Sequence, residues 1–260
     1  MFGTYLKRVL KSPVFILCVI VTVVVMVMGC YTDLSVSKNN VTPVLYCIII
    51  THTFGISHML IPILTVMPFL FFYVEEIEKK VVYYQLIRSN KKAYYMGQIL
   101  TALISAGLVA CLSMVIFTFV CMIYGAGWQV DNSIKEYFIG TFFEKMINNG
   151  NVIAVYLIHC LAILCFSLPW TLVSMVVSLY SKNRFVIISS SFISYMAISY
   201  LTQMASLEKL DPGLTLLKGK MKSEPGGGIY HTLLYHFILI SVLSAIYFIV
   251  SKRRFTNEGI

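Results

Sequence analysis

The sequence predicts an all-α polytopic membrane protein, built as a single transmembrane domain over residues 1–260. Three observations support this fold class. The chain is 58% hydrophobic and 12% charged, whereas soluble domains are about half apolar and roughly a quarter charged. Its apolar residues gather in segments long enough to cross hydrocarbon, which takes about 20 residues. No stretch between these segments is long and polar enough to form a separate soluble domain.

Six apolar segments are the predicted transmembrane helices: about 13–31, 44–73, 94–124, 152–180, 185–205 and 230–250. Helices are the default because a backbone in lipid has no water with which to form hydrogen bonds. The second, third and fourth segments exceed one span, so we expect them to tilt or to extend past the headgroups. The first is too long for a signal peptide and lacks a small-residue cleavage site, so we expect it to be retained.

The distribution of lysine and arginine predicts the orientation of the chain. With the N-terminus in the cytoplasm, most of the 20 Lys and Arg fall in cytoplasmic segments, and most acidic residues fall on the other side. The positive-inside rule therefore places both termini in the cytoplasm. The net charge of +9 is then a property of one membrane face, which suits anionic lipid and argues against a nucleic-acid partner.

The first eleven residues have the pattern of an amphipathic helix that lies in the cytoplasmic membrane interface. Apolar residues recur at helical spacing, and basic residues occupy the other side: Phe2, Tyr5, Leu6, Val9 and Leu10 against Lys7, Arg8 and Lys11. Pro13 then turns the chain into the first span. The alternative is that these residues are a frayed N-terminal segment without a stable helix.

The motifs that would give the chain its own chemistry are missing. The string nearest to a phosphate-binding loop, Gly213 to Met221, has the wrong glycine spacing and a methionine in place of the hydroxyl residue. None of the five histidines forms the i, i+4 pair of the zinc helix motif, and no carboxylate lies inside a predicted span. We therefore expect no ATPase, metal or cofactor site in this chain. A membrane-embedded serine enzyme that uses His159 stays open as an alternative.

The seven cysteines all lie within or at the ends of apolar runs, without metal-binding spacing. We expect them to behave as small buried apolar residues. A bridge between Cys30 and Cys47 at the outer face is the alternative.

The scarcity of ionisable residues in the spans bears on transport. Ion-coupled carriers usually place such residues in the membrane, so we expect energy to come from a partner, and an ion-coupled secondary transporter is the alternative. Polar residues mark a candidate translocation path along the second and fifth segments: His52, Ser57, His58, Thr65 and Ser194. Hydrogen bonding between helices would explain the same residues.

Residues 73–98 form the one long, highly charged segment of the chain, which the predicted topology places on the cytoplasmic face. Glu75 and Glu76 open it, which suits the first turn of a helix. A mostly apolar run with a basic border follows: Val81, Val82, Tyr83, Tyr84, Gln85, Leu86, Ile87 and Arg88. Such a run is typical of a protein-docking site. Burial against the bilayer surface is the alternative.

Taken together, these features resemble an ABC-2 type transporter permease, the membrane subunit of a type-2 ABC exporter of the short Gram-positive class. The resemblance covers nearly the whole chain. It is carried by the basic lead FGTYLKRVLKSP, by six spans with both ends inside, and by the segment YVEEIEKKVVYYQLIRSNKKAYY. It implies that residues 81–88 form a coupling helix that fits a groove of a separate ATPase subunit, preceded by the Glu75/Glu76 turn. It also implies two short outer-leaflet helices within 205–230.

The resemblance implies a multi-pass protein of the bacterial cell membrane that dimerises with itself or with a similar permease. ATP and magnesium would be bound by the partner ATPase, and its closure would reach the second and fifth spans at the dimer interface through residues 81–88. The implied activity is the export of an amphipathic substrate, either a bacteriocin-like peptide or a lipid-like molecule, possible roles being export and self-protection.

Overall fold

The computed structural model describes residues 2–36, 43–53, 57–88, 91–130, 132–139, 143–207, 211 and 227–257. All regular elements in these ranges are α-helices, and one isolated bridge pairs Pro43 with Gly127. The predicted all-α class is therefore confirmed.

Long apolar helices dominate the molecule. They are α2 (Pro13–Gly29), α5 (Ser57–Glu78), α7 (Lys91–Ile123), α10 (Val152–Ser178), α11 (Arg184–Met204) and α13 (Gly227–Asn257). Within the described ranges, five of them are long and apolar enough to cross a membrane, and a sixth span results if α1 (Phe2–Leu10) and α2 form one bent element. These helices support a membrane-embedded, multi-pass protein.

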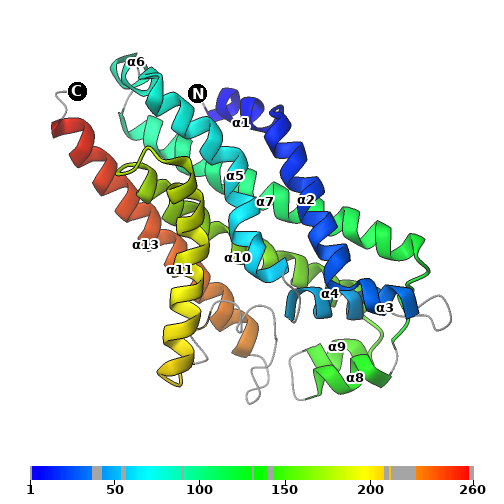
Figure 1. Ribbon diagram of the computed structural model, residues 1–260. Coiled ribbons are helices and arrows are strands. Elements are labelled where there is room, and N and C mark those ends of the chain that lie inside the picture. The colour runs from blue at the N-terminus through cyan, green and yellow to red at the C-terminus, as the bar shows by residue number, and fades with distance from the viewer. Residues whose placement is uncertain are drawn as a thin grey trace.

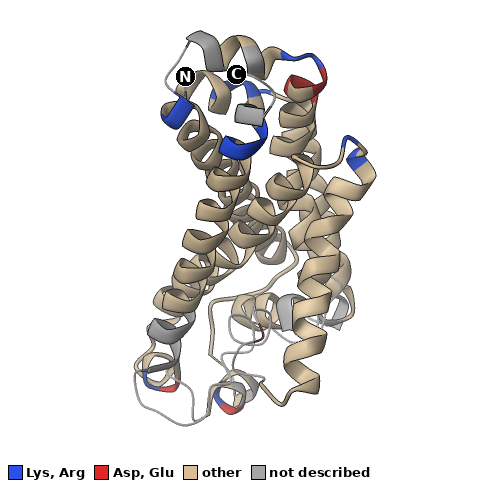
Figure 2. Ribbon diagram, turned by 90° about the vertical axis from the view of Figure 1, so that its left-hand side faces the viewer, with Lys and Arg blue, Asp and Glu red and all other residues tan. Residues whose placement is uncertain are grey.

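Charge separates the two ends of the molecule from its middle. Figure 2 shows Lys, Arg, Asp and Glu at the two ends of the bundle and uncharged helices between them. Both termini and α6 (Val81–Arg88) lie at one end, and the short helices α3 (Tyr31–Val36), α4 (Val44–Thr53), α8 (Asn132–Phe138) and α9 (Phe143–Asn148) lie toward the other (Figure 1). A charge-free middle layer is the arrangement that a hydrocarbon core requires.

The turn from α1 into α2 follows the sequence prediction. Ser12 caps α2, its hydroxyl oxygen accepting a hydrogen bond from the Phe15 amide at 3.2 Å, and Pro13 occupies the first turn, where no amide hydrogen is needed. The two helices meet at 57°. The bend lets α1 lie across the end of the bundle while α2 runs along it.

The second predicted span, 44–73, corresponds to two described helices, α4 and α5, and residues 54–56 between them lie outside the described part of the structure. Helix α5 continues beyond residue 73 to Glu78. The Ser57 hydroxyl, at the start of α5, donates a hydrogen bond to the Thr51 carbonyl in the last turn of α4. This bond satisfies one of the carbonyls that the end of a helix leaves without a partner inside the helix. The candidate path residues therefore lie in part at the ends of two helices, α4 and α5.

Helix α10 lies at the centre of the bundle and packs against α5, α7, α11 and α13. Its Trp170 is buried and meets the rings of Phe166 and Tyr195 at centroid distances of 6.1 and 5.3 Å. Helices α11 and α13 are peripheral and expose many large apolar side chains, such as Tyr200 and Phe237. Such faces are compatible with lipid as the surrounding medium.

The end opposite the termini has more structure than the sequence predicted. Helices α8 and α9 form a small apolar cluster with α4 and the start of α10, in which the Phe138 and Phe143 rings lie 5.4 Å apart. Ile134 and Ile147 complete the buried side of these short helices. The outer-leaflet helices expected within 205–230 fall almost entirely outside the described residues.

The cysteines are free thiols in the structure. Cys30 and Cys47, the candidate bridge, lie buried together with Cys121 in the largest apolar cluster. They therefore contribute to packing between α2, α4 and α7.

A buried hydrogen bond joins two distant parts of the sequence. The hydroxyl oxygens of Tyr73 on α5 and Tyr247 on α13 lie 2.7 Å apart, and both side chains are fully buried. We expect Tyr247→Phe to reduce stability by about 1 kcal/mol, the usual net value of such a bond. Thermal unfolding in detergent checks this. Adding Tyr73→Phe should cost little more, because one change already breaks the bond.

Candidate functional site

Helix α6 occupies the run that the sequence singled out, with bounds Val81–Arg88. The chain reverses between α5 and α6 through Lys80, which has a left-handed φ of 56°. The Lys79 and Lys80 amides donate to the carbonyls of Glu75 and Ile77 and so close the last turn of α5. Helix α6 packs on α5 and α7 at the end of the molecule that carries both termini (Figure 1).

The described side chains of α6 divide into an inward and an outward set. Val82 is fully buried against Tyr5, Tyr94 and Tyr95, and Gln85 is half-buried. Tyr84 is 69% exposed. The side chains of Tyr83, Leu86, Ile87 and Arg88 lie outside the described part of the structure. Among the described side chains of α6, Tyr84 is therefore the large exposed one.

Glu75 and Glu76 do not open a helix, so that part of the prediction was wrong. Together with Glu78 they occupy the last turns of α5, where the helix dipole disfavours negative charge. Each acid has a cationic neighbour. Glu75 pairs with Lys79, Glu76 with Arg8, and Glu78 with Arg184, whose Nη2 donates to Oε2 at 2.8 Å. These ion pairs offset the unfavourable interaction between the three carboxylates and the dipole of α5.

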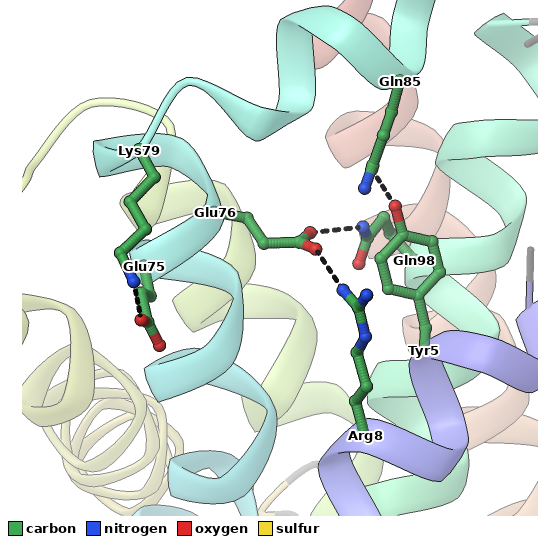
Figure 3. Close-up of polar contacts among 7 residues, drawn as sticks. All are labelled: Tyr5, Arg8, Glu75, Glu76, Lys79, Gln85 and Gln98. Atoms are coloured by element: carbon green, nitrogen blue, oxygen red, sulfur yellow. Dashed lines mark hydrogen bonds and ion pairs between the residues drawn. The ribbon is translucent and has the colours of Figure 1, made fainter. Parts of the chain in front are cut away.

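Glu76 differs from its two acidic neighbours because it is buried, with an exposed fraction of 5%. Figure 3 shows its carboxylate between Arg8 of α1 and Gln98 of α7. Arg8 Nη1 lies 4.0 Å from Oε1, and Gln98 Nε2 donates to Oε2 at 3.4 Å. Gln85 of α6 lies near the same carboxylate (Figure 3). Glu76 thus contacts α1 and α7 directly and has α6 close by.

Tyr5 supplies a second connection from α1 to α6. Its hydroxyl donates to Gln85 Oε1 (Figure 3), and its ring contacts Phe72 and Tyr94 edge to face. Burial, with a smaller contribution from the Glu76 carboxylate, raises the pKa of Tyr5 well above its usual value. Tyr5 therefore stays protonated and remains a donor at any physiological pH.

The predicted N-terminal helix forms, and part of its apolar side packs against the bundle. Tyr5 and Val9 are buried against the bundle, while Phe2, Leu6 and Leu10 are partly buried. Lys7 and Lys11 are exposed. Helix α1 packs on α5, α7 and α2 and so forms part of the bundle end.

The candidate path residues are spread over several helices. Ser57 begins α5, Thr65 lies further along it and donates to the Ile61 carbonyl at 2.8 Å, and Ser194 is half-buried on α11. The side chains of His52 and His58 lie outside the described residues. The Ser57 hydroxyl bonds to a carbonyl of α4, as hydrogen bonding between helices would require, whereas the Thr65 bond lies within α5. The path remains a prediction.

Three residues of this region were not singled out by the sequence as site residues. Arg8 and Arg184 were read as orientation signals, yet both form ion pairs with acids of α5. Gln98 is the one amide side chain of the long helix α7, and this isolation is the signal that could have marked it. Nothing in the spacing of Arg8 or Arg184 indicates their partners.

Within the described ranges, no group of His, Cys, Asp and Glu side chains is arranged to hold a metal ion. Comparison of the chain with protein-family models, curated proteins and solved structures finds no match. A functional conclusion therefore has to come from the residues and the geometry themselves.

Proposed function

We propose that this chain is the transmembrane subunit of an ATP-driven exporter, similar to the permeases of type-2 ABC transporters and energised by a separate ATPase subunit. The substrate class that fits the resemblance is an amphipathic peptide or a lipid-like molecule. The proposed setting is the bacterial cell membrane, with both termini in the cytoplasm and a second permease copy as partner.

Helix α6 is the observation that carries the proposal. It is a short helix held between two long apolar helices, at the basic end of the bundle, and it presents Tyr84 outward. Exposed aromatic residues next to a charged rim are typical of protein interfaces. A protein without a nucleotide-binding motif needs such a contact to receive the energy of ATP hydrolysis.

Two other functions make different demands on the chain. An ion-coupled carrier would be expected to place ionisable side chains along the spans, yet the sequence has no Lys, Arg, Asp or Glu within 93–123, 152–178 or 185–204. A membrane-embedded enzyme would require turnover by the purified single chain. Transport that collapses with an ionophore and needs no ATPase would favour the carrier.

Copurification tests the proposed function. The chain carrying an affinity tag is purified from its own host in mild detergent, and ATP hydrolysis by the eluate is measured before and after reconstitution. We expect an ATPase subunit in stoichiometric amount, with hydrolysis that rises in the presence of the transported substrate. Transport by the chain without any ATPase would contradict the proposal.

The orientation is tested separately. Fusion of a reporter that is active only in the cytoplasm to residue 260, and a second fusion between α8 and α9, should give opposite signals. We expect activity at the C-terminus and none in the α8–α9 region, because the basic end faces the cytoplasm. The reverse pattern would place α6 on the outer face, where no ATPase could reach it.

A further inference from the structure

We infer that Glu76 is a positioning residue that joins α1 and α6 into one unit, so that the attachment of α1 sets the orientation of α6. The contact between α1 and α6 lies within this chain and needs no partner subunit. Its consequence for energy coupling rests on the proposed function.

Glu76 is buried in the last turns of α5. A buried carboxylate is costly unless cations and hydrogen-bond donors surround it, and its position at the end of α5 adds the unfavourable helix dipole. Groups from other helices supply part of this compensation: Arg8 from α1 pairs with Oε1, Gln98 from α7 donates to Oε2, and Gln85 from α6 lies nearby. Oε1 itself accepts no hydrogen bond from the described residues. Any motion of α1 or α6 away from α5 would remove part of this compensation.

Helices α1 and α6 are also connected directly. The Tyr5 hydroxyl donates to Gln85 Oε1, and the Tyr5 ring belongs to the apolar cluster that buries Val82. Gln85 therefore contacts Tyr5 directly and lies near Glu76 (Figure 3). The inward side of α6 is held by α1 and by the α5 carboxylate together, while Tyr84 on the outward side stays exposed.

The two neighbouring acids, Glu75 and Glu78, do not connect α1 with α6. Glu75 is exposed and pairs with Lys79 one turn away on the same helix end, and Glu78 forms a partly exposed pair with Arg184. Exposed pairs of this kind contribute little. Glu75→Gln is therefore a matched control, since it removes one negative charge from the same turn without touching the contact between α1 and α6.

Limited proteolysis measures the attachment of α6 in the full-length chain. Helix α6 lies between Lys79 and Lys80 on one side and Lys91 and Lys92 on the other, so trypsin can cut next to it whenever it opens. With the protein in lipid nanodiscs, we expect Glu76→Gln to raise the cleavage rate at these four lysines about tenfold, as loss of a bond to a buried charged group implies. Glu75→Gln should leave the rate unchanged.

Two further observations separate positioning from a general loss of structure. Cleavage at Lys135 and Lys145, at the far end of the molecule, should not change in Glu76→Gln, whereas unfolding would raise it. Arg8→Gln should give the same increase as Glu76→Gln, and the double variant should add little, because both changes break one contact. Unchanged cleavage next to α6 in Glu76→Gln, fully additive effects, or equal increases at both ends would each overturn the inference.

The outcome is independent of the search for an ATPase. Proteolysis uses the chain alone, so a missing ATPase partner would refute the proposed function and leave the proteolysis result standing. In an assembled complex, we expect Glu76→Gln to retain the ATPase subunit while the substrate transported per ATP falls several-fold.

Discussion

Replacing Tyr84 with aspartate is expected to weaken the binding of the proposed ATPase subunit about 30-fold, the loss typical of an interface hot spot of about 2 kcal/mol. Tyr84 is the large exposed side chain among the described residues of α6. A carboxylate there would replace an aromatic contact with a charge that the interface must desolvate. Copurification at graded salt and detergent concentration measures the loss, and substrate-stimulated ATP hydrolysis should fall in parallel.

Tyr180 provides the matched control for this experiment. It is an exposed tyrosine directly after α10, so the same change to aspartate alters the same kind of side chain away from α6. We expect Tyr180→Asp to retain the ATPase. Equal losses in both variants would indicate a general effect of charge or stability. Full retention in Tyr84→Asp would remove α6 from the coupling route.

The largest effect on stability is expected for Trp170→Ala, at about 3–5 kcal/mol, the range for removal of a large buried aromatic. Trp170 is 1% exposed and packs between Phe166 of its own helix and Tyr195 of α11. Its indole nitrogen makes no hydrogen bond to the described residues, so the loss comes from packing alone. Packing is the main source of helix association in lipid, where the hydrophobic drive between helices is absent.

Thermal unfolding followed by the loss of monodisperse protein in detergent measures this change. Phe237→Ala on α13 is the matched control, because it also truncates an aromatic side chain to a methyl group but at an exposed position. We expect a large drop in the midpoint for Trp170→Ala and a small one for Phe237→Ala. Trp170→Phe should recover much of the loss, since a ring again fills part of the space. Similar midpoints for the two alanine variants would contradict a core centred on α10.

Composition and local chemistry were enough to predict the all-α class, because 18 or more apolar residues in a row leave little choice of structure in lipid. The beginning of α2 was also predictable, since Ser12 and Pro13 act on the first turn alone. The bounds of α6 follow from the lysines on both sides of a short apolar run. In each case the determinant lies within a few residues of the element that it shapes.

Long-range partners were not predictable from one sequence. Glu75 and Glu76 suit a helix beginning by local chemistry, yet they lie in the last turns of α5. The cation that pairs with Glu76, Arg8, comes from a helix almost seventy residues earlier in the sequence. The packing of α4 against α2 and α7 is also a long-range contact that hydrophobicity does not encode. Helices α8 and α9 are likewise held by contacts with α4 and α10 and lack the length for a signal of their own.

Site-specific photocrosslinking at position 84 tests the central claim most directly. A photoreactive phenylalanine analogue replaces Tyr84 in living cells, and position 180 carries the same analogue in a parallel culture. We expect position 84 to crosslink to a protein that has a nucleotide-binding motif and hydrolyses ATP, and position 180 to give no such product. Crosslinks from position 84 to lipid alone, or to no ATPase in cells that transport the substrate, would contradict the account.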